Sequence, residues 1–425
     1  MLLLGSGSAV STLAAEPEFE ADVQHYAVTI TPDVRRRQVS GRAEITVRGK
    51  DRPTSVLRFD AGDLEVTAVL DRGRPVSYTK QAHALQIHLS PPLRVGEVRR
   101  LSISYHGSPT RGLEFHPERG ELYTVFSTSQ WMPCVDSPSE RATLDLTLRL
   151  PPGMKSVGTG REIGRQNASG SRWRLDTPMP SYLYGFAAGR YAQFSQKANG
   201  YTLRFLSTDR SPRELQGIFK DTSDMLHFFT ERAGLRFSDV YTQVLVTKTI
   251  GQELAGVSLL SETYGTQVLA DPTALSLMAH EAAHQWWGNL LTSKDWRHFW
   301  LNEGFATFMA AAYLEHRFGA AEYSKQVDSW RNRLDKLRAD GKDKPLVYPD
   351  WKSPTADDRA VVYQKGAYVL HVLREELGEA AFWRGIREYT KAHAGRSVET
   401  KEFETAMEDA SGRNLAEFFR VWVLG

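Results

Sequence analysis

The sequence predicts a protein of the α+β class, with an N-terminal antiparallel β domain followed by a mainly helical domain. Up to about residue 190 apolar residues recur at every second position, and turn residues separate these runs at short intervals. After about residue 210 the apolar period becomes helical. A chain of 425 residues is long enough for two or three domains. We place the β domain at 17–195 and the helical domain at 196–425.

Alternating apolar residues mark the strands of the first half, because successive side chains of a strand point to opposite faces. The clearest runs are Ala43, Ile45 and Val47; Leu85, Ile87 and Leu89; Leu101, Ile103 and Tyr105; and Leu144, Leu146 and Leu148. Turn residues break these runs at Asp71-Arg72-Gly73, Pro91-Pro92 and Pro151-Pro152-Gly153. Short connections between short strands favour antiparallel pairing.

Helical spacing marks the second half. It appears first at Leu215, Ile218, Phe219, Leu226 and Phe229. Long alanine-rich stretches with few turn residues follow. Near the end, two further helices are predicted, with a break between them at Gly412.

Composition excludes several classes of protein. Lys plus Arg number 53 and Asp plus Glu 51, so a net charge of +2 gives no electrostatic case for nucleic acid or an anionic membrane. Cys134 is the only cysteine, which rules out an intramolecular disulfide and a cysteine-based metal cluster. No apolar run approaches the roughly 20 residues that cross a bilayer. A metal site would need histidine and carboxylate ligands.

The first 16 residues resemble the remnant of a signal peptide. They are apolar and small, and Leu13-Ala14-Ala15 is similar to a signal-peptidase site, although no basic segment precedes it. We therefore expect an exported, periplasmic or secreted protein. The alternative is a cytoplasmic protein with a poorly ordered N-terminus.

The sequence His280-Glu281-Ala282-Ala283-His284 is an H-E-x-x-H motif within a helical pattern that runs from Leu275 to Trp287. The i, i+4 spacing puts both imidazoles on one helix face, as two ligands of one tetrahedral zinc require. Glu281 lies about a quarter turn away, so we expect it to reach a water that the metal activates and to act as the general base. A catalytic zinc needs a third protein ligand, and Glu303 on the next predicted helix is the candidate. We expect one Zn²⁺ per chain.

The full pattern resembles the gluzincin aminopeptidases, the family of aminopeptidase N and leukotriene hydrolase. The resemblance rests on the zinc motif with Glu303, on its flanks His284–Thr292 and Trp300–Ala306, and on the segments Pro133–Pro138, Pro178–Phe186 and Tyr363–Ala367. It covers nearly the whole chain from about residue 20. It implies a thermolysin-like catalytic domain, with Tyr363 stabilising the oxyanion of the tetrahedral intermediate.

The chain departs from the family at the positions that bind the substrate's amine. Where the family has Gly-Ala-Met-Glu-Asn, this chain has Ile250-Gly251-Gln252-Glu253-Leu254. The resemblance implies substrate binding by Gly251 and Glu253, with Glu253 as the amine anchor, although Leu254 replaces the familiar amide. Gln130 is the candidate for a second amine-binding residue. The chain is also similar to a short form of the family that lacks the large C-terminal helical domain. We therefore expect either a more open cleft or a partner subunit that covers the cleft. The oligomeric state stays open.

We therefore expect a zinc aminopeptidase that acts on peptides with a free N-terminus. Three rivals remain. A thermolysin-like endopeptidase would share the zinc and the base but has no use for an amine anchor. An epoxide hydrolase is the second rival, because one member of the family has that activity. The third, a non-enzyme, is a catalytically inactive binding module on the same fold.

Overall fold

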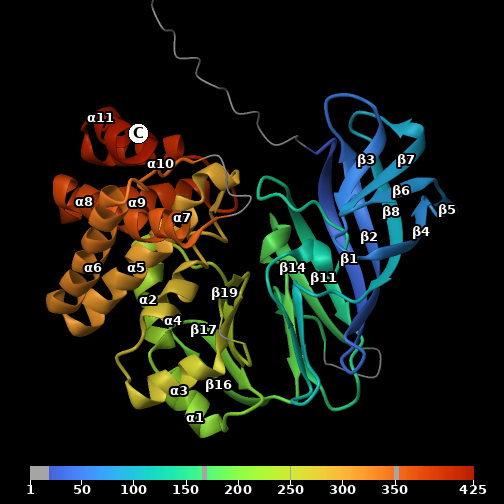
Figure 1. Ribbon diagram of the computed structural model, residues 1–425, viewed down its shortest axis with the longest axis horizontal. Helices are drawn as coiled ribbons and strands as arrows, with labels where there is room; N and C mark the ends of the chain where they lie inside the picture. Colours follow the sequence, from blue (N-terminus) through green and yellow to red (C-terminus); the bar gives the residue numbers. More distant parts are fainter. Residues whose placement is uncertain (1–18, 165–169, 249, 349–353) are drawn as a thin grey trace, which may run out of the picture.

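The computed structural model describes residues 19–164, 170–248, 250–348 and 354–425. Figure 1 shows the strands of the first half on one side and the helices of the second half on the other. The predicted α+β class, with the β half first, is confirmed. The predicted signal-peptide remnant, residues 1–16, lies outside the described residues, so export stays a prediction.

Three sheets build the described part of the first half. The largest has the strand order β13-β14-β11-β1-β2-β8-β4-β5, and the others have the orders β3-β7-β6 and β12-β15-β10-β9. The strands of the largest sheet are β1 (Ala21–Asp33), β2 (Gln38–Gly49), β4 (Glu65–Asp71), β5 (Arg74–Pro75), β8 (Val98–Gly107), β11 (Arg141–Leu148), β13 (Arg161–Glu162) and β14 (Ser171–Pro180). The strands of the smaller sheets are β3 (Thr54–Asp60), β6 (Tyr78–Gln81), β7 (Ala84–Leu93), β9 (Leu113–His116), β10 (Glu121–Thr124), β12 (Lys155–Gly158) and β15 (Phe186–Gly189).

The strands predicted from alternating residues are present as β2, β7, β8 and β11, and their apolar residues are buried. One pair differs from the antiparallel prediction. β1 and β11 run parallel, from His25 opposite Thr143 to Ile30 opposite Leu148. The prediction rested on short turns between neighbouring strands. Strands that are far apart in the sequence are not bound by that constraint.

The second half contains a mixed sheet that the sequence did not predict. Its strand order is β16-β17-β18-β20-β19. These strands are β16 (Ala192–Ala198), β17 (Tyr201–Ser207), β18 (Val240–Val246), β19 (Gly251–Leu254) and β20 (Val257–Ser261). The predicted domain boundary after residue 195 falls inside β16, so the sheets place the change between β15 and β16.

The helices of the second half pack against this sheet and against one another (Figure 1). They are α1 (Pro212–Ile218), α2 (Thr222–Ala233), α3 (Glu262–Ala270), α4 (Ser276–Ala283), α5 (Trp300–Phe318), α6 (Ala320–Ala339), α7 (Ala356–Ala360), α8 (Gly366–Leu377), α9 (Glu379–His393), α10 (Thr400–Ser411) and α11 (Ala416–Phe419). Shorter elements are the 3₁₀ turns η1 (Thr128–Gln130), η2 (Ser181–Leu183) and η3 (Trp296–His298), the π-helical turns η4 (Val361–Lys365) and η5 (Arg420–Leu424), and a small sheet of β21 (Thr292–Ser293) and β22 (Ser397–Val398). The predicted break at Gly412 is confirmed, with φ at 68°. None of the helices among the described residues is long and apolar enough to cross a bilayer.

The five-stranded sheet lies between two apolar cores. Leu245 of β18 and Leu260 of β20 belong to the core formed with the helices. Val244 of β18, Leu254 of β19 and Leu259 of β20 belong to the core of the β half. Because alternate residues enter different cores, the sheet joins the two halves. Its edge strand β19 runs along their junction.

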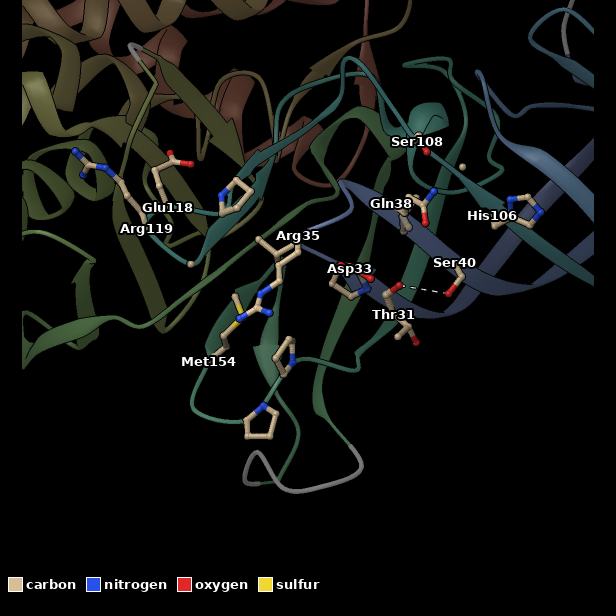
Figure 2. A pocket seen from close by; sticks show the side chains of 18 of the residues that line it. Thr31, Asp33, Arg35, Gln38, Ser40, His106, Ser108, Glu118, Arg119 and Met154 are labelled. Atoms are coloured by element: carbon tan, nitrogen blue, oxygen red, sulfur yellow. Dashed lines mark hydrogen bonds between the residues drawn. The ribbon is translucent and has the colours of Figure 1, made fainter.

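A hollow of about 1060 Å³ lies in the β half, and Figure 2 shows it from close by. The β1–β2 hairpin, the turn at Pro117–Gly120 and the segment Pro151–Met154 line it, and Ser40 Oγ donates to Thr31 O across the hairpin (3.3 Å). Among the described residues, no group of clustered metal ligands lies in this hollow. The chemistry-bearing residues gather elsewhere, beside β19.

Candidate metal centre

Two histidines converge from one face of α4. His280 and His284 are four residues apart, a spacing that brings side chains to the same side of a helix. Their Nε2 atoms lie 3.0 Å apart, and the rings meet edge to face with centroids 4.6 Å apart. The helix ends at Ala283 with His284 at its C-cap, before the predicted end at Trp287. Both Nε2 atoms face one point, as two ligands of one cation do.

The next long helix brings a carboxylate to the same point. Glu303 lies in the first turn of α5, and its Oε2 is 3.3 Å from His280 Nε2 and 3.4 Å from His284 Nε2. The three ligand atoms lie within 4.8 Å of one another. Glu303 Oε2 is buried and has no hydrogen bond from any residue that the structure describes. A buried oxygen without a donor, beside two imidazole nitrogens, fits a metal ion that all three residues share.

A backbone carbonyl sets the tautomer of His284. Its Nδ1 lies 3.0 Å from Trp287 O, and a carbonyl only accepts, so Nδ1 carries a hydrogen and Nε2 is left for a metal ion or a second proton. Gly288 allows this contact, because a Cβ there would lie 2.7 Å from Nδ1. On the other ring, His280 Nδ1 lies 3.4 Å from Thr307 Oγ1. Each imidazole is therefore held from behind with Nε2 aimed at the centre.

The charges in this cluster depend on one another. Burial opposes a charge on His284, but the Glu303 carboxylate outweighs burial and raises the pKa of His284 to about 10. Burial lowers the pKa of His280, and His284 lowers it further. Burial also opposes ionisation of Glu303, yet His284 and His280 hold the pKa of that carboxyl far below its usual range. Glu303 is thus a buried anion that needs a cation beside it, either a proton on His284 or a metal ion.

Glu281 lies beside this cluster with its side chain buried. Within the described part of the chain its Oε2 has no hydrogen-bond partner. Burial raises the pKa of Glu281 well above its usual range, and the carboxyl of Glu253 raises it further. Gly251 of β19 lets the carboxyl group come this close, because a Cβ there would clash with Glu281 Oε1. The carboxyl group therefore has one free oxygen and a strong tendency to hold a proton.

Tyr363 covers the His280 ring. The two rings stack with centroids 5.8 Å apart and planes 10° apart. Tyr363 lies in the π-helical turn η4, and Gly304 and Gly366 allow this turn to approach α5, since a Cβ on either glycine would lie 2.9 Å from the other's Cα. Burial and the Glu303 carboxylate raise the pKa of Tyr363 far above its usual value. Its hydroxyl therefore stays protonated and can donate a hydrogen bond.

Strand β19 brings a second carboxylate to the cluster. In this strand Gln252 and Leu254 are buried, whereas Gly251 and Glu253 are half-buried and line the cavity beside the metal cluster. Burial raises the pKa of Glu253, although His284 partly opposes the rise. Leu254, the departure from the family motif, packs in the core of the β half. The replacement of the family's amide by Leu254 therefore affects the face of β19 that points away from Glu253.

Two cavities meet at the metal cluster. The first, of about 420 Å³, is lined by Glu253, Tyr363 and all three candidate ligands. The second, of about 550 Å³, shares Gly251, His280, Glu281 and Tyr363 with the first but does not reach Glu253. A chain molecule that passes from one cavity to the other would cross the cluster.

Two models of one family match this chain. Residues 22–183 match the peptidase M1 N-terminal domain, and residues 255–422 match the peptidase family M1 domain, which contains the candidate ligands and Tyr363. The chain belongs to peptidase family M1. This finding confirms the predicted membership of the aminopeptidase N family.

The relatives of this M1 chain are distant in sequence, and the solved structures among them are close to it in fold. It is 24% identical to aminopeptidase N of Lactococcus lactis subsp. lactis, over 92% of this chain and 50% of the relative, and 25% identical to puromycin-sensitive aminopeptidase of Caenorhabditis elegans, over 99% and 48%. The chain thus spans about half the length of these curated relatives. An M1 zinc metallopeptidase from Deinococcus radiodurans is 26% identical with a TM-score of 0.81, over 96% of this chain and 94% of that one. Yeast LTA4 hydrolase is 20% identical with a TM-score of 0.81, over 95% and 68%, and shares the fold.

Gln130, the candidate for a second amine-binding residue, is not among the residues that line either cavity. It is buried at the end of η1. With its amide oriented to satisfy both neighbours, Gln130 donates to Asp63 Oδ2 and accepts from Arg111 Nη2, each at 3.2 Å. These contacts hold together loops of the β half. The structure does not bring Gln130 to the metal cluster.

Sequence reasoning assigned no role to seven residues that line the first cavity. They are Phe126, Ser127, Asp136, Tyr182, Trp296, Phe299 and Arg359. Asp136 and Tyr182 lie in segments that carry the family resemblance, so a signal was present for them. Phe126 and Ser127 have φ values of 46° and 42°, and Gln252, with its amide turned, accepts from Phe126 N at 2.9 Å. Such tertiary contacts leave no periodic pattern in the sequence.

Proposed function

We propose that this chain is a zinc-dependent aminopeptidase, which removes N-terminal residues from peptides. The observation that carries the proposal is the position of Glu253, whose carboxyl group lines the same cavity as the metal cluster. A carboxylate at this place suits a substrate ammonium. The names of the curated relatives, aminopeptidase N and puromycin-sensitive aminopeptidase, support the same activity.

His280 Nε2, His284 Nε2 and a carboxylate oxygen of Glu303 would hold the metal. Two histidines and one glutamate are a donor set typical of catalytic zinc. The solved relative from Deinococcus radiodurans is described as a zinc metallopeptidase, which supports zinc as the metal. When bound, zinc supplies Lewis acidity that polarises a carbonyl and lowers the pKa of water.

The protein's own residues would move the proton and support the negative charge. Glu281, with one free carboxylate oxygen, takes a proton from the attacking water and delivers it to the nitrogen of the leaving amine. Tyr363 donates its hydroxyl hydrogen to the oxygen of the scissile carbonyl as negative charge develops there. The apolar walls of the cavity, at Phe126, Trp296 and Phe299, exclude water from these polar contacts.

The rivals differ in what they require. An endopeptidase does not need a carboxylate beside the first residue of the substrate, so Glu253 favours an exopeptidase. An inactive binding module does not need a buried Glu281 with a free oxygen, a costly feature that serves catalysis. No observation favours an epoxide hydrolase. Exported location, oligomeric state and the lack of nucleic-acid partners stay predictions from the sequence.

The test compares one peptide with free and acetylated N-termini. Acetylation removes the ammonium and leaves Glu253 unpaired in the complex, so kcat/KM should fall by about a hundredfold or more. Glu253→Ala should erase much of this difference, whereas Glu388→Gln, which removes an exposed charge on α9, should preserve it. Equal kcat/KM for the free and acetylated peptides would exclude an aminopeptidase and favour the endopeptidase.

A further inference from the structure

Among the described residues that line the cavity beside the metal cluster, one has a permanent positive charge. Arg359 is the only lysine or arginine among the described residues that line it. It lies on α7, four residues before Tyr363, so both side chains fall on the same side of the chain as it winds through α7 and η4. Arg359 is exposed, and no described residue forms a hydrogen bond or an ion pair with its guanidinium.

The acidic residues next to Arg359 are committed to other partners. Asp357 pairs with Arg333 at 2.7 Å and with Lys342 at 2.6 Å. Asp358 pairs with Lys344 and accepts from the backbone and hydroxyl of Thr355 as part of a capping box. The guanidinium of Arg359 is therefore left for a ligand.

The two cavities would hold different parts of a peptide substrate. Glu253 and Arg359 both line the first cavity, and neither lines the second. A peptide whose ammonium lies at Glu253 has its first side chain in the first cavity. The leaving part of the peptide crosses the cluster towards the second cavity, past Gly251 and Glu281.

We propose that Arg359 binds a carboxylate on the side chain of the N-terminal residue, so that this protein favours peptides that begin with Asp or Glu. The inference rests on the proposed function, since it deepens the aminopeptidase activity with a substrate class. A guanidinium binds a carboxylate through two parallel hydrogen bonds, a geometry that a neutral amide does not match.

Asp136 is the group that opposes this preference, because it lines the same cavity and would favour a basic first residue. Its Oδ2 already accepts a hydrogen bond from Ser129 Oγ at 3.0 Å. Burial raises the pKa of Asp136, and Arg111 offsets part of its charge. Arg359, exposed and without a partner among the described residues, has the more available charge of the two.

The test measures kcat/KM for the p-nitroanilides of Glu, Gln, Leu and Arg, since Gln has the shape of Glu without its charge. The wild type should favour Glu over Gln by about three- to tenfold, a modest ratio because Arg359 is exposed. Arg359→Gln should abolish this ratio and leave the Leu substrate unaffected, and Arg359→Lys should restore part of it. Arg35→Gln, at the exposed hairpin of Figure 2, removes the same charge far from the cavity and should change nothing.

Other outcomes overturn the inference in different ways. An unchanged Glu/Gln ratio in Arg359→Gln, with the Leu substrate cleaved, would remove Arg359 from specificity and leave the aminopeptidase standing. If the wild type cleaved the Arg substrate faster than the Glu substrate, Asp136 rather than Arg359 would determine which first residue is preferred.

A carboxylate also occurs at the C-terminus of a short peptide, so Leu-Ala is compared with Leu-Ala amide. If Arg359→Gln alters only that ratio, Arg359 binds the C-terminal carboxylate and the proposal is wrong. Failure to cleave any substrate would reject the proposed function itself.

Discussion

Two clusters of buried charge, one in each half of the molecule, differ in how their members are paired. In the β half, Arg99 is fully buried, and its side chain makes five hydrogen bonds, to Glu97, Asp71 and the carbonyls of Pro91 and Pro92. In the helical half, buried oxygens of Glu281 and Glu303 have no donor among the described residues. Both clusters combine carboxylates with cationic groups. In the first, the guanidinium of Arg99 has all of its hydrogen bonds, although Asp71 Oδ1 accepts none from the described residues and lies 3.6 Å from Arg72 Nε. In the second, the buried carboxyl oxygens that face the cavity lack donors within the described part of the chain.

This difference separates a structural from a functional use of buried charge. A buried polar group without a partner costs free energy, whereas a satisfied one does not. The Arg99 cluster therefore supports the fold, and loss of one member should lower stability. The buried oxygens of Glu281 and Glu303 destabilise the ligand-free protein, and a bound metal or substrate removes this destabilisation. Loss of either residue should therefore lower activity or metal binding rather than stability.

The largest expected effect follows from loss of a ligand. The wild type should hold about one zinc per chain. Glu303→Ala should hold far less, and its activity should fall to the level of metal-stripped protein, because two imidazoles alone leave the ion without its anionic ligand. Elemental analysis after dialysis measures the metal. Full zinc in Glu303→Ala would remove Glu303 from the ligand set.

Glu281→Gln should reduce kcat by about 10²–10⁴, the usual contribution of a general base. Zinc content should be unchanged, since Glu281 is not among the clustered ligands. In the metal-free protein this variant should unfold at a urea concentration no lower than the wild type, because the amide removes a buried acid that lacks a donor. A variant that lost its zinc would show that Glu281 holds the metal.

Tyr363→Phe should reduce kcat by about 10²–10³ and change KM little, because the lost hydrogen bond forms as charge develops on the substrate. The ring that stacks on His280 is retained, so zinc content should not change. Steady-state kinetics on a Leu substrate measures both constants. Near-normal kcat would mean that another group supports the oxyanion.

The smallest effect on activity is expected in the β half, where the effect on stability is largest. Arg99→Leu leaves Asp71 buried with only Arg72, 3.6 Å away, as a cationic neighbour, and the free energy of unfolding should fall by about 3–5 kcal/mol. At low temperature the folded variant should keep its kcat. Urea unfolding, followed by tryptophan fluorescence, measures the loss. If stability were unchanged, the contrast between the two clusters would not hold.

Local patterns were sufficient to predict the metal cluster. His280 and His284 are related by one helical turn, and Glu303 lies in the first turn of the next helix, so short-range geometry brings the three close. The alternating strands and the break at Gly412 are predictable for the same reason. Each depends on the conformation of a few consecutive residues.

Features that depend on distant contacts were not predictable. The five-stranded sheet mixes parallel and antiparallel strands from separate segments. Gln130 was assigned by its place in the sequence, but contacts with Asp63 and Arg111 turn it away from the cavity. Nothing in the sequence marks Arg359 as a candidate for substrate binding. Its guanidinium is available because Asp357 and Asp358 pair with other residues, and those pairs form only in the folded protein.

The parallel pairing of β1 with β11 also bears on how the chain folds as it is made. His25 and Thr143, opposite each other in this pair, are 118 residues apart. Closing so long a loop costs entropy before any contact repays it, and such topologies fold slowly. Until residues 141–148 leave the ribosome, β1 has an open edge, and an open strand edge is a template for pairing with other chains. The yield of folded protein in a cell therefore depends on how quickly β11 reaches β1, a step that the stability of the finished molecule does not measure.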